Sequence, residues 1–423
     1  MAAFDSKQDL SALLEVLNDR RKLQGDKIAL ESGFSIDEET LLPSFMKLPV
    51  DLSLNDASEI VSKAIFSTRL PLGFSQSELS RVCRDIYHEQ RRSKKFEFLV
   101  FTHFTMDDTF PTDPFIEGKT EIDLSIGRTQ SVRSKLYEQH AAELAAVEED
   151  SQNRIHNFQG RAVIARIKAT NAKAGFVTAR KSLDKFRGAL NLAINLSQLG
   201  RRTFGSTTRA VNTILNSKFS TVHDEEGIAI KNSVWFERDW IAPTKLFQYS
   251  KIDEVRRKRF SDVLGYMKTQ HGLSELAHEG LIRYCRALDS TNWQYSFLEL
   301  WSVLEFLCCI DSNQNHDTIC TRVCALYADK ELTRLYMNHL KIRRNGLVHA
   351  GYEIEERYAE QILYQLNRYV SRVLYFVLSN ALELNSKDEL REFLDLNLDV
   401  ARLQRRRRII NSAIEFRRPR TIE

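Results

Sequence analysis

The spacing of hydrophobic residues changes several times over the first 250 positions, which indicates a region that mixes helices and strands. Leu10, Leu13, Leu14 and Leu17 recur on one helical face and predict an amphipathic helix over residues 7–23. By the same pattern, helices are expected over 76–92 and over most of 130–200, and strands over 95–104 and 120–126, with a late hairpin made of 227–230 and 234–236.

Two further features of this region come from its turn residues and its most apolar segment. Residues 24–75 contain Pro43, Pro49 and Pro71 and are predicted to be irregular, because proline ends or bends regular elements. Residues 95–104 are apolar on both faces of a strand, so this strand should lie inside a sheet. His103 within it is expected to be a core histidine.

From about residue 252 the pattern becomes wholly helical. Amphipathic helices are predicted over 273–288, 293–308, 317–328 and 358–377, with a further helix that leads up to residue 340. The predicted fold is therefore mixed, with an N-terminal α/β (α+β) region over 1–250, an all-α helical bundle over 251–384 and a basic C-terminal segment over 385–423.

One motif stands at the end of the helix that leads up to residue 340. Arg344 is followed directly by the polar Asn345, and four residues separate Arg344 from His349. The run Phe-Leu-Glu-Leu-Trp-Ser-Val-Leu-Glu over 297–305 precedes it, and Ala-Gly-Tyr over 350–352 follows it. Together these residues resemble HEPN domains, and in particular the ApeA-like branch found in bacterial defence proteins. The resemblance covers about residues 252–384.

Other arginine and histidine pairs have similar spacing: Arg133 with His140, Arg334 with His339, and Arg343 with the same His349. Ser134 and Leu335 follow the first two arginines, and neither fits the polar position as well as Asn345 does. The resemblance therefore selects Arg344, Asn345 and His349 as the catalytic candidates. Glu305 stands at a family-like position and is a weaker candidate.

The resemblance implies a metal-independent endoribonuclease without a cofactor, in which RNA supplies its own nucleophile, the 2′-hydroxyl. His349 would take or give a proton, Arg344 would hold the scissile phosphate, and Asn345 would bind the phosphate or orient the imidazole. The expected role is a defence or toxin effector that cleaves tRNA or mRNA. The family builds its site across a homodimer, and a phage or host trigger could act through the N-terminal region.

Three readings of function remain open at this point. The first is the ribonuclease. The second is an inactive HEPN fold that serves dimerisation or binds RNA or a nucleotide, in which Arg344 pairs with an acid such as Glu305. The third is an enzyme of the N-terminal region that uses metal or a nucleoside triphosphate. Only the third requires a divalent metal, so sensitivity to EDTA separates it from the first.

Charge is concentrated at the C-terminus. Residues 401–423 contain eight arginines and two glutamates, and so carry +6 in a chain whose net charge is +4. We expect Arg405, Arg406, Arg407 and Arg408 to contact the RNA backbone, with a solvated surface or an acidic protein partner as the alternatives. The cluster is expected to continue a helix or to start a disordered arm.

Composition adds two limits. No apolar run approaches the ~18–20 residues that a membrane span needs, so we expect a cytoplasmic protein that does not bind membranes. The six cysteines do not form a disulfide framework. His316, Cys320 and Cys324 share the spacing of one helix face, which would suit metal ligands, but burial in the core is the expected explanation.

Overall fold

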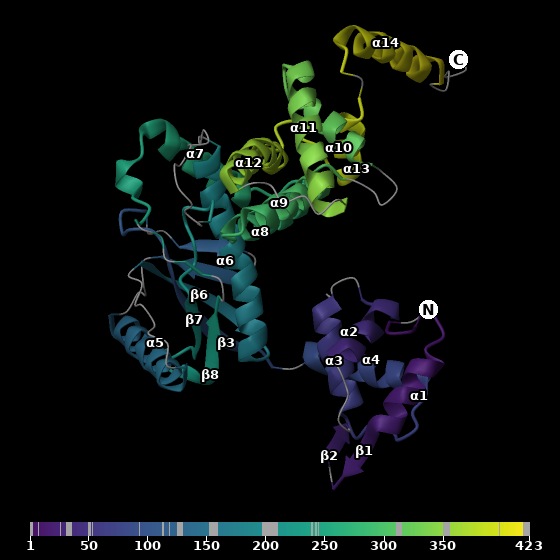
Figure 1. Ribbon diagram of the computed structural model, residues 1–423, viewed down its shortest axis with the longest axis vertical. Coiled ribbons are helices and arrows are strands. Elements are labelled where there is room, and N and C mark those ends of the chain that lie inside the picture. The colour runs from purple at the N-terminus through teal and green to yellow at the C-terminus, as the bar shows by residue number, and fades with distance from the viewer. Residues whose placement is uncertain are drawn as a thin grey trace, which may run out of the picture. The chain divides into compact units, whose positions relative to one another are not determined.

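The computed structural model divides the chain into two compact units, Met1–Lys95 and Phe96–Glu423 (Figure 1). Residues 3–417 are described except for 7, 26, 31–35, 50–51, 53, 93, 112–113, 118, 125–129, 152–159, 197–209, 238–239, 242, 244, 310–314, 350–355 and 397. The mixed fold is confirmed in its coarse form, because strands are interspersed with helices up to Phe236 and every later described element is a helix. No helix within the described residues is long and apolar enough to cross a membrane.

The first unit is mainly helical around a small core of its own. Its elements are α1 (Ser11–Arg20), the antiparallel pair β1 (Arg21–Gln24) and β2 (Lys27–Leu30), α2 (Ile36–Phe45), α3 (Leu54–Ile65) and α4 (Gln76–Arg92). The helix predicted over 76–92 is confirmed, and its apolar face is buried in this core. The helix predicted over 7–23 ends at Arg20, because the chain turns there into β1.

The prediction that residues 24–75 are irregular is wrong. No proline falls between Pro49 and Pro71, so α3 can form there, and Ile60, Val61 and Ala64 of α3 are buried. The guanidinium of Arg21 is buried at the end of this helix and donates hydrogen bonds to four backbone carbonyls, those of Ile65, Ser67, Leu70 and Pro71. These bonds satisfy carbonyls that a helix end leaves without partners.

The second unit begins with a six-stranded antiparallel sheet in the order β4-β5-β6-β3-β7-β8. Its strands are β3 (Phe96–Phe104), β4 (Phe115–Glu117), β5 (Thr120–Asp123), β6 (Arg161–Ala169), β7 (Phe219–Asp224) and β8 (Ala229–Phe236). The strand predicted over 95–104 is confirmed as the central β3. Helices α5 (Gln130–Ser151) and α6 (Ala172–Asn195) pack against opposite faces of the sheet.

Two predictions for this region are wrong. Residues 161–169 were included in a mostly helical stretch but form β6, which pairs with β3 on one side and β5 on the other. A strand buried on both faces is a continuous apolar run, and its spacing does not distinguish it from a buried helix. The two halves of the predicted hairpin, 227–230 and 234–236, both contribute to β8, and the true partner strand is β7.

The helical part of the second unit follows the sheet. After the short η1 (Tyr249–Lys251) come α7 (Glu254–Lys268), α8 (Ser274–Asp289), α9 (Trp293–Leu307), α10 (His316–Cys324), α11 (Lys330–His349), α12 (Glu356–Ser379), α13 (Lys387–Leu394) and α14 (Val400–Arg417). One hydrophobic core continues from the sheet through α6 into α8, α9 and α12. Along the chain, the boundary between the two compact units lies between Lys95 and Phe96. The domain boundary expected near residue 250 stays a prediction.

Helix α6 joins the sheet to the bundle through a close approach to α8. A Cβ atom on Gly188 of α6 would overlap the backbone oxygen of Leu281 on α8, so only glycine fits there. Deeper along the same contact, the Tyr284 hydroxyl accepts a hydrogen bond from Asn195 and donates one to Asn367 on α12, both at 2.8 Å. These bonds satisfy a buried hydroxyl and hold α6, α8 and α12 together.

Candidate functional site

The motif residues lie on the last turns of α11, which stays helical through Gly346 to His349. The glycine at position 346 does not end the helix. In a regular helix, five positions rotate a side chain by about 140° net, so Arg344 and His349 point to different sides. Arg344 is half-buried and His349 is exposed. Residues 350–352, which follow the motif in the resemblance, lie outside the described residues.

Glu305 on α9 has two polar neighbours. Its Oε1 accepts a hydrogen bond of 3.0 Å from Trp301 Nε1 on the preceding turn and lies 3.3 Å from His316 Nδ1 at the start of α10. The Trp301 and His316 rings meet edge to face, with centroids 5.8 Å apart. Among the described residues, the carboxylate is not paired with Arg344, so the Arg344–Glu305 ion pair of the alternative interpretation is not seen.

His316 connects Glu305 with the motif. Burial lowers its pKa, the positive charge of Arg344 lowers it further, and His349 and Lys341 act in the same direction. Glu305 opposes them and raises the pKa of His316. The ion pair of Lys341 with Asp317, the residue after His316, holds this part of α11 beside the start of α10. Arg344 follows Lys341 by about one helical turn, and His349 lies further along the same helix. Glu305, His316, Arg344 and His349 therefore border the contact between the end of α11 and the start of α10. We call these four residues the α11-end cluster.

An ion pair borders the cluster. Lys341 Nζ on α11 lies 2.5 Å from Asp317 Oδ1 on α10, and this contact lowers the pKa of Asp317 and raises that of Lys341. It holds the end of α11 against the start of α10. In contrast, Asn345 Oδ1 is buried and has no hydrogen-bond partner among the described residues. A buried acceptor without a partner costs free energy unless a ligand or water satisfies it.

The possible metal ligands on α10 do not form a site. The ligand atoms of His316, Cys320 and Cys324 are not gathered at metal-binding distance. Both cysteines are buried, and burial raises the pKa of Cys320 to about 11, so this thiol stays protonated near neutral pH. The expectation that these cysteines belong to the core is confirmed by their burial.

Elsewhere in the described chain, one group has metal-ligand geometry: the ligand atoms of Asp184, Cys285 and Asp289 lie within 4.8 Å of one another. Arg187 occupies the position of a cation, because its buried guanidinium lies 2.8 Å from Asp184 Oδ1 and 2.8 Å from Asp289 Oδ2. A second arginine, Arg286, contacts Asp184 Oδ2 at 2.8 Å. This network is therefore an internal ion-pair cluster between α6 and α8.

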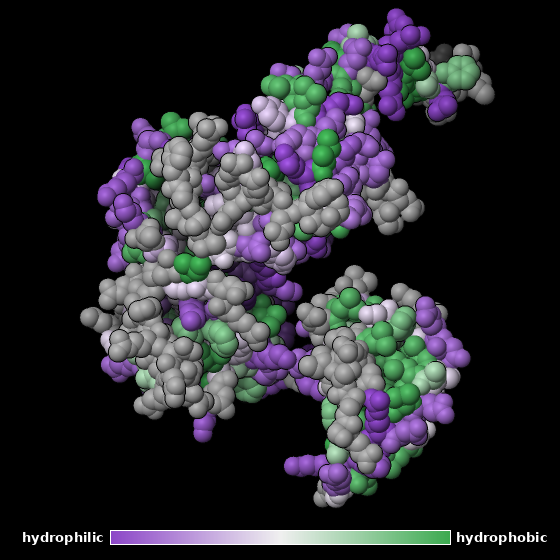
Figure 2. All heavy atoms as spheres, viewed as in Figure 1, coloured by the Kyte–Doolittle hydropathy of each residue, from purple (hydrophilic) through white to green (hydrophobic). Residues whose placement is uncertain are grey.

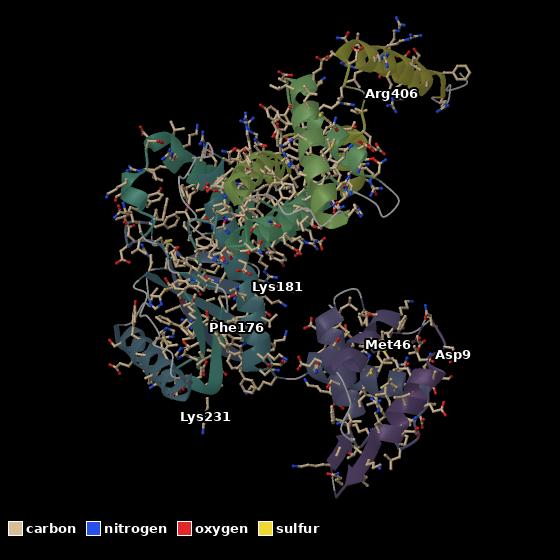
Figure 3. The ribbon with its side chains drawn as sticks, in the orientation of Figure 1. Asp9, Met46, Phe176, Lys181, Lys231 and Arg406 are labelled. Carbon is tan, nitrogen blue, oxygen red and sulfur yellow. The ribbon has the colours of Figure 1, made fainter. Side chains whose placement is uncertain are left out.

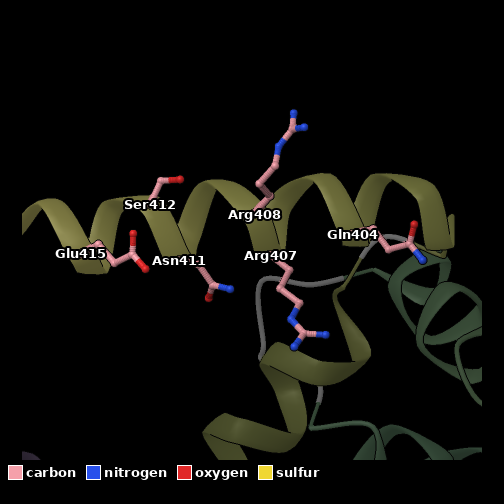
Figure 4. A pocket seen from close by; sticks show the side chains of 6 residues that line it. All are labelled: Gln404, Arg407, Arg408, Asn411, Ser412 and Glu415. Carbon is pink, nitrogen blue, oxygen red and sulfur yellow. The ribbon is translucent and has the colours of Figure 1, made fainter.

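Arg402, Arg405 to Arg408 and Arg417 lie on α14, which buries no residue. Arg405, Arg406, Arg407 and Arg408 are all exposed, and no described residue forms an ion pair with them. Figure 3 labels Arg406 on α14. The close view in Figure 4 shows Arg407 and Arg408 leaving the helix in opposite directions. A shallow hollow along α14 is lined by Gln404, Arg407, Arg408, Asn411, Ser412 and Glu415.

Helix α14 is also apolar in part. Ile409, Ile410, Ile414 and Phe416 are exposed beside the arginines, and Figure 2 shows green and purple residues next to each other along it. Of the two expected forms of the basic cluster, the helix is the one observed as far as Arg417. Arg418 and Arg420 lie outside the described residues.

Comparison with protein-family models, with curated proteins and with solved structures found no significant match. The HEPN resemblance of the motif stays a prediction.

Proposed function

We propose that this protein is a metal-independent endoribonuclease of the HEPN type, in which Arg344 and His349 act on RNA. The observation that supports it best is the α11-end cluster. It combines Arg344 and His349 on the last turns of α11 with His316 at the start of α10 and Glu305 on α9. Such a set can transfer protons and bind a phosphate. The proposed role is a defence or toxin effector that cleaves tRNA or mRNA.

The reaction needs no nucleophile from the protein. A ribose 2′-hydroxyl attacks the adjacent phosphorus, the bond from phosphorus to the 5′-oxygen breaks, and a proton moves from the first oxygen to the second. His349 exchanges a proton with one of these oxygens. Arg344 neutralises the charge that develops on the phosphate, and Asn345 offers its amide as a donor. The products are a 2′,3′-cyclic phosphate and a 5′-hydroxyl.

RNA binding is proposed to extend to α14, where Arg405, Arg406, Arg407 and Arg408 are free of ion pairs within the described chain. Each arginine that neutralises a phosphate releases counterions, so binding by this helix would depend on salt and not on sequence. A homodimer that brings two α11 helices together is part of the proposal, and so is control by a trigger acting on residues 1–250.

One observation favours a second candidate function. Arg344 and His349 are rotated about 140° apart on an unbroken helix, so a single chain does not point both at one phosphate without movement. An inactive HEPN module that dimerises, or that binds RNA or a nucleotide, is compatible with that geometry. Such a module would bind without cleaving.

The test compares purified wild type with Arg344→Ala and His349→Ala on tRNA and total RNA in EDTA, and compares the toxicity of the three on expression. We expect cleavage by wild type and a loss of about 10²- to 10⁴-fold in each variant, the usual size of such contributions. Arg343→Ala is the matched control, because Arg343 is adjacent, exposed and at similar spacing from His349. Equal cleavage by all four proteins would refute the proposal, and binding without cleavage by wild type would favour the second candidate.

A further inference from the structure

The second histidine of the α11-end cluster is placed as an acid–base group would be. His316 is the first residue of α10, after the cap residue Asn315, and its side chain is 28% exposed. Its Nδ1 faces Glu305 Oε1 at 3.3 Å, and no described residue forms a hydrogen bond with its Nε2. One ring nitrogen thus has a carboxylate partner, and the other has none among the described residues.

Glu305 is itself fixed. Its Oε1 accepts the hydrogen bond from Trp301 Nε1 one turn earlier on α9, and Trp301 is almost fully buried in the core. The carboxylate is therefore held against a rigid part of the bundle. A carboxylate that faces one nitrogen of an imidazole favours the tautomer with its proton on that nitrogen, which leaves the other nitrogen free to accept a proton.

We infer that His316 is a second catalytic histidine of the proposed ribonuclease, with Glu305 as its positioning residue. This inference rests on the proposed function. In the bond-making step, His316 Nε2 takes the proton of the 2′-hydroxyl as its oxygen attacks phosphorus. His349 gives a proton to the 5′-oxygen as the bond from phosphorus to that oxygen breaks. One proton enters the protein and one leaves it, so the step is balanced and needs no other reactant.

The surroundings of His316 suit a base. The protonated imidazole is disfavoured by three groups of α11, Arg344, His349 and Lys341, and by the N-terminus of α10. It is favoured by Glu305 on α9 and by the neighbouring Asp317. Burial adds to the first group, and the pKa of His316 is lowered in sum. His316 is therefore largely neutral at pH 7 and able to accept a proton.

The assignment of His316 as the base changes what the motif residues Arg344 and His349 must do. The rotation between Arg344 and His349 is an obstacle only if those two side chains must do all the chemistry. With His316 on the side of the bundle and His349 at the exposed end of α11, one chain supplies both a base and an acid from different directions. Arg344 follows Lys341 by three positions on α11, and Lys341 is paired with Asp317, the residue after His316, so Arg344 lies near the base.

The experiment is the pH dependence of kcat for RNA cleavage in EDTA. Wild type should give a bell-shaped profile, and His316→Gly should lose about 10²- to 10⁴-fold in kcat with little change in KM. Added imidazole should restore part of that activity, because it can occupy the space of the missing ring. His339→Ala is the matched control, since His339 is a half-buried histidine on α11 outside the cluster, and it should keep the wild-type profile.

Glu305→Gln tests the positioning role. It removes the charge that raises the pKa of His316 but keeps an oxygen for the Trp301 bond, so the acidic limb of the profile should move to lower pH. An NMR titration of the His316 ring should move in the same direction without any need for activity.

Three results would overturn the inference: wild-type kcat in His316→Gly, loss of kcat without imidazole rescue in a variant that melts like wild type, or an unchanged acidic limb in Glu305→Gln. Failure of the proposed function is distinguished by the wild-type protein, which would then not cleave RNA at all. In that case the inference falls with it.

Discussion

Three histidines lie together on the face of the sheet that α5 covers. His140 Nδ1 and His223 Nε2 each lie 2.8 Å from the Thr221 hydroxyl, and the rings of His103 and His140 are 5.7 Å apart. Burial lowers the pKa of His103 to about 4, of His140 to about 3 and of His223 to about 4. The sequence predicted a core role for His103 but did not show that two other histidines join it.

These histidines predict that the protein loses stability in mild acid. Below pH ~6.5 the unfolded chain binds protons that the folded chain, with lower histidine pKa values, does not bind. The free energy of unfolding should fall between pH ~6.5 and ~4, by up to about 1.4 kcal/mol per pH unit for each group. Urea unfolding of wild type and of His140→Gln between these pH values measures the free energy of unfolding. This free energy should fall less steeply with decreasing pH in the variant. Identical slopes would contradict the role of His140.

The candidate site shows what single residues reveal in sequence and what they do not. The spacing from Arg344 to His349 and the polar Asn345 were visible as a pattern. His316 was visible only as a possible metal ligand, because eleven positions and a change of helix separate it from Glu305. That pairing depends on how α10 folds back beside the end of α9, which no local pattern encodes.

At the scale of helices and strands, the sequence predicted correctly those elements that have one apolar face and one polar face. Helices α4, α8 and α9 were found near their true bounds for this reason. β6 and α3 were missed: the first is buried on both faces over its first five residues, and the second lies between prolines that seemed to exclude it. The six-stranded order of the sheet depends on distant pairings, such as β3 with β7, and could not be predicted.

Helix α14 carries a prediction about salt. Replacing Arg405, Arg406, Arg407 and Arg408 by glutamine keeps helix propensity and removes four charges. If these residues contact RNA phosphates, the log–log salt slope of binding should flatten by up to about 3, since each contact contributes about 0.7 for single strands. Cleavage at saturating RNA should change little.

The chain offers a matched control for this experiment. Helix α7 contains another run of four basic residues, Arg256, Arg257, Lys258 and Arg259, and the first of these is paired with Asp253. Replacing that run by glutamine removes the same charge from a different element. If both variants flatten the slope equally, net charge and not α14 determines binding.

At the scale of the whole molecule, the outer face of α11 predicts a homodimer. Leu335 is 68% exposed and Ile342 is 67% exposed, and with His349 they recur every seven residues along one line of the helix. Two such faces packed together would bury these side chains and bring two sites close. Ile342→Glu should shift sedimentation toward the monomer.

A matched control distinguishes that effect from a general effect of charge. Val255 on α7 is 64% exposed, so Val255→Glu makes the same change on another surface and should leave the dimer intact. A wild-type protein that sediments only as a monomer while it cleaves RNA would contradict the homodimer. The assignment of both acid and base to one chain would still stand.

The chemistry of the cut ends is the most direct measurement. RNA cleaved by wild type in EDTA should carry 2′,3′-cyclic phosphate or 3′-phosphate ends and 5′-hydroxyl ends, and both should form about 10²- to 10⁴-fold more slowly with His349→Ala. These ends follow from attack by the 2′-hydroxyl, which needs only proton transfer and a cation beside the phosphate. Ends with 3′-hydroxyl and 5′-phosphate, or cleavage that requires added divalent metal, would contradict the proposed ribonuclease site at Arg344 and His349.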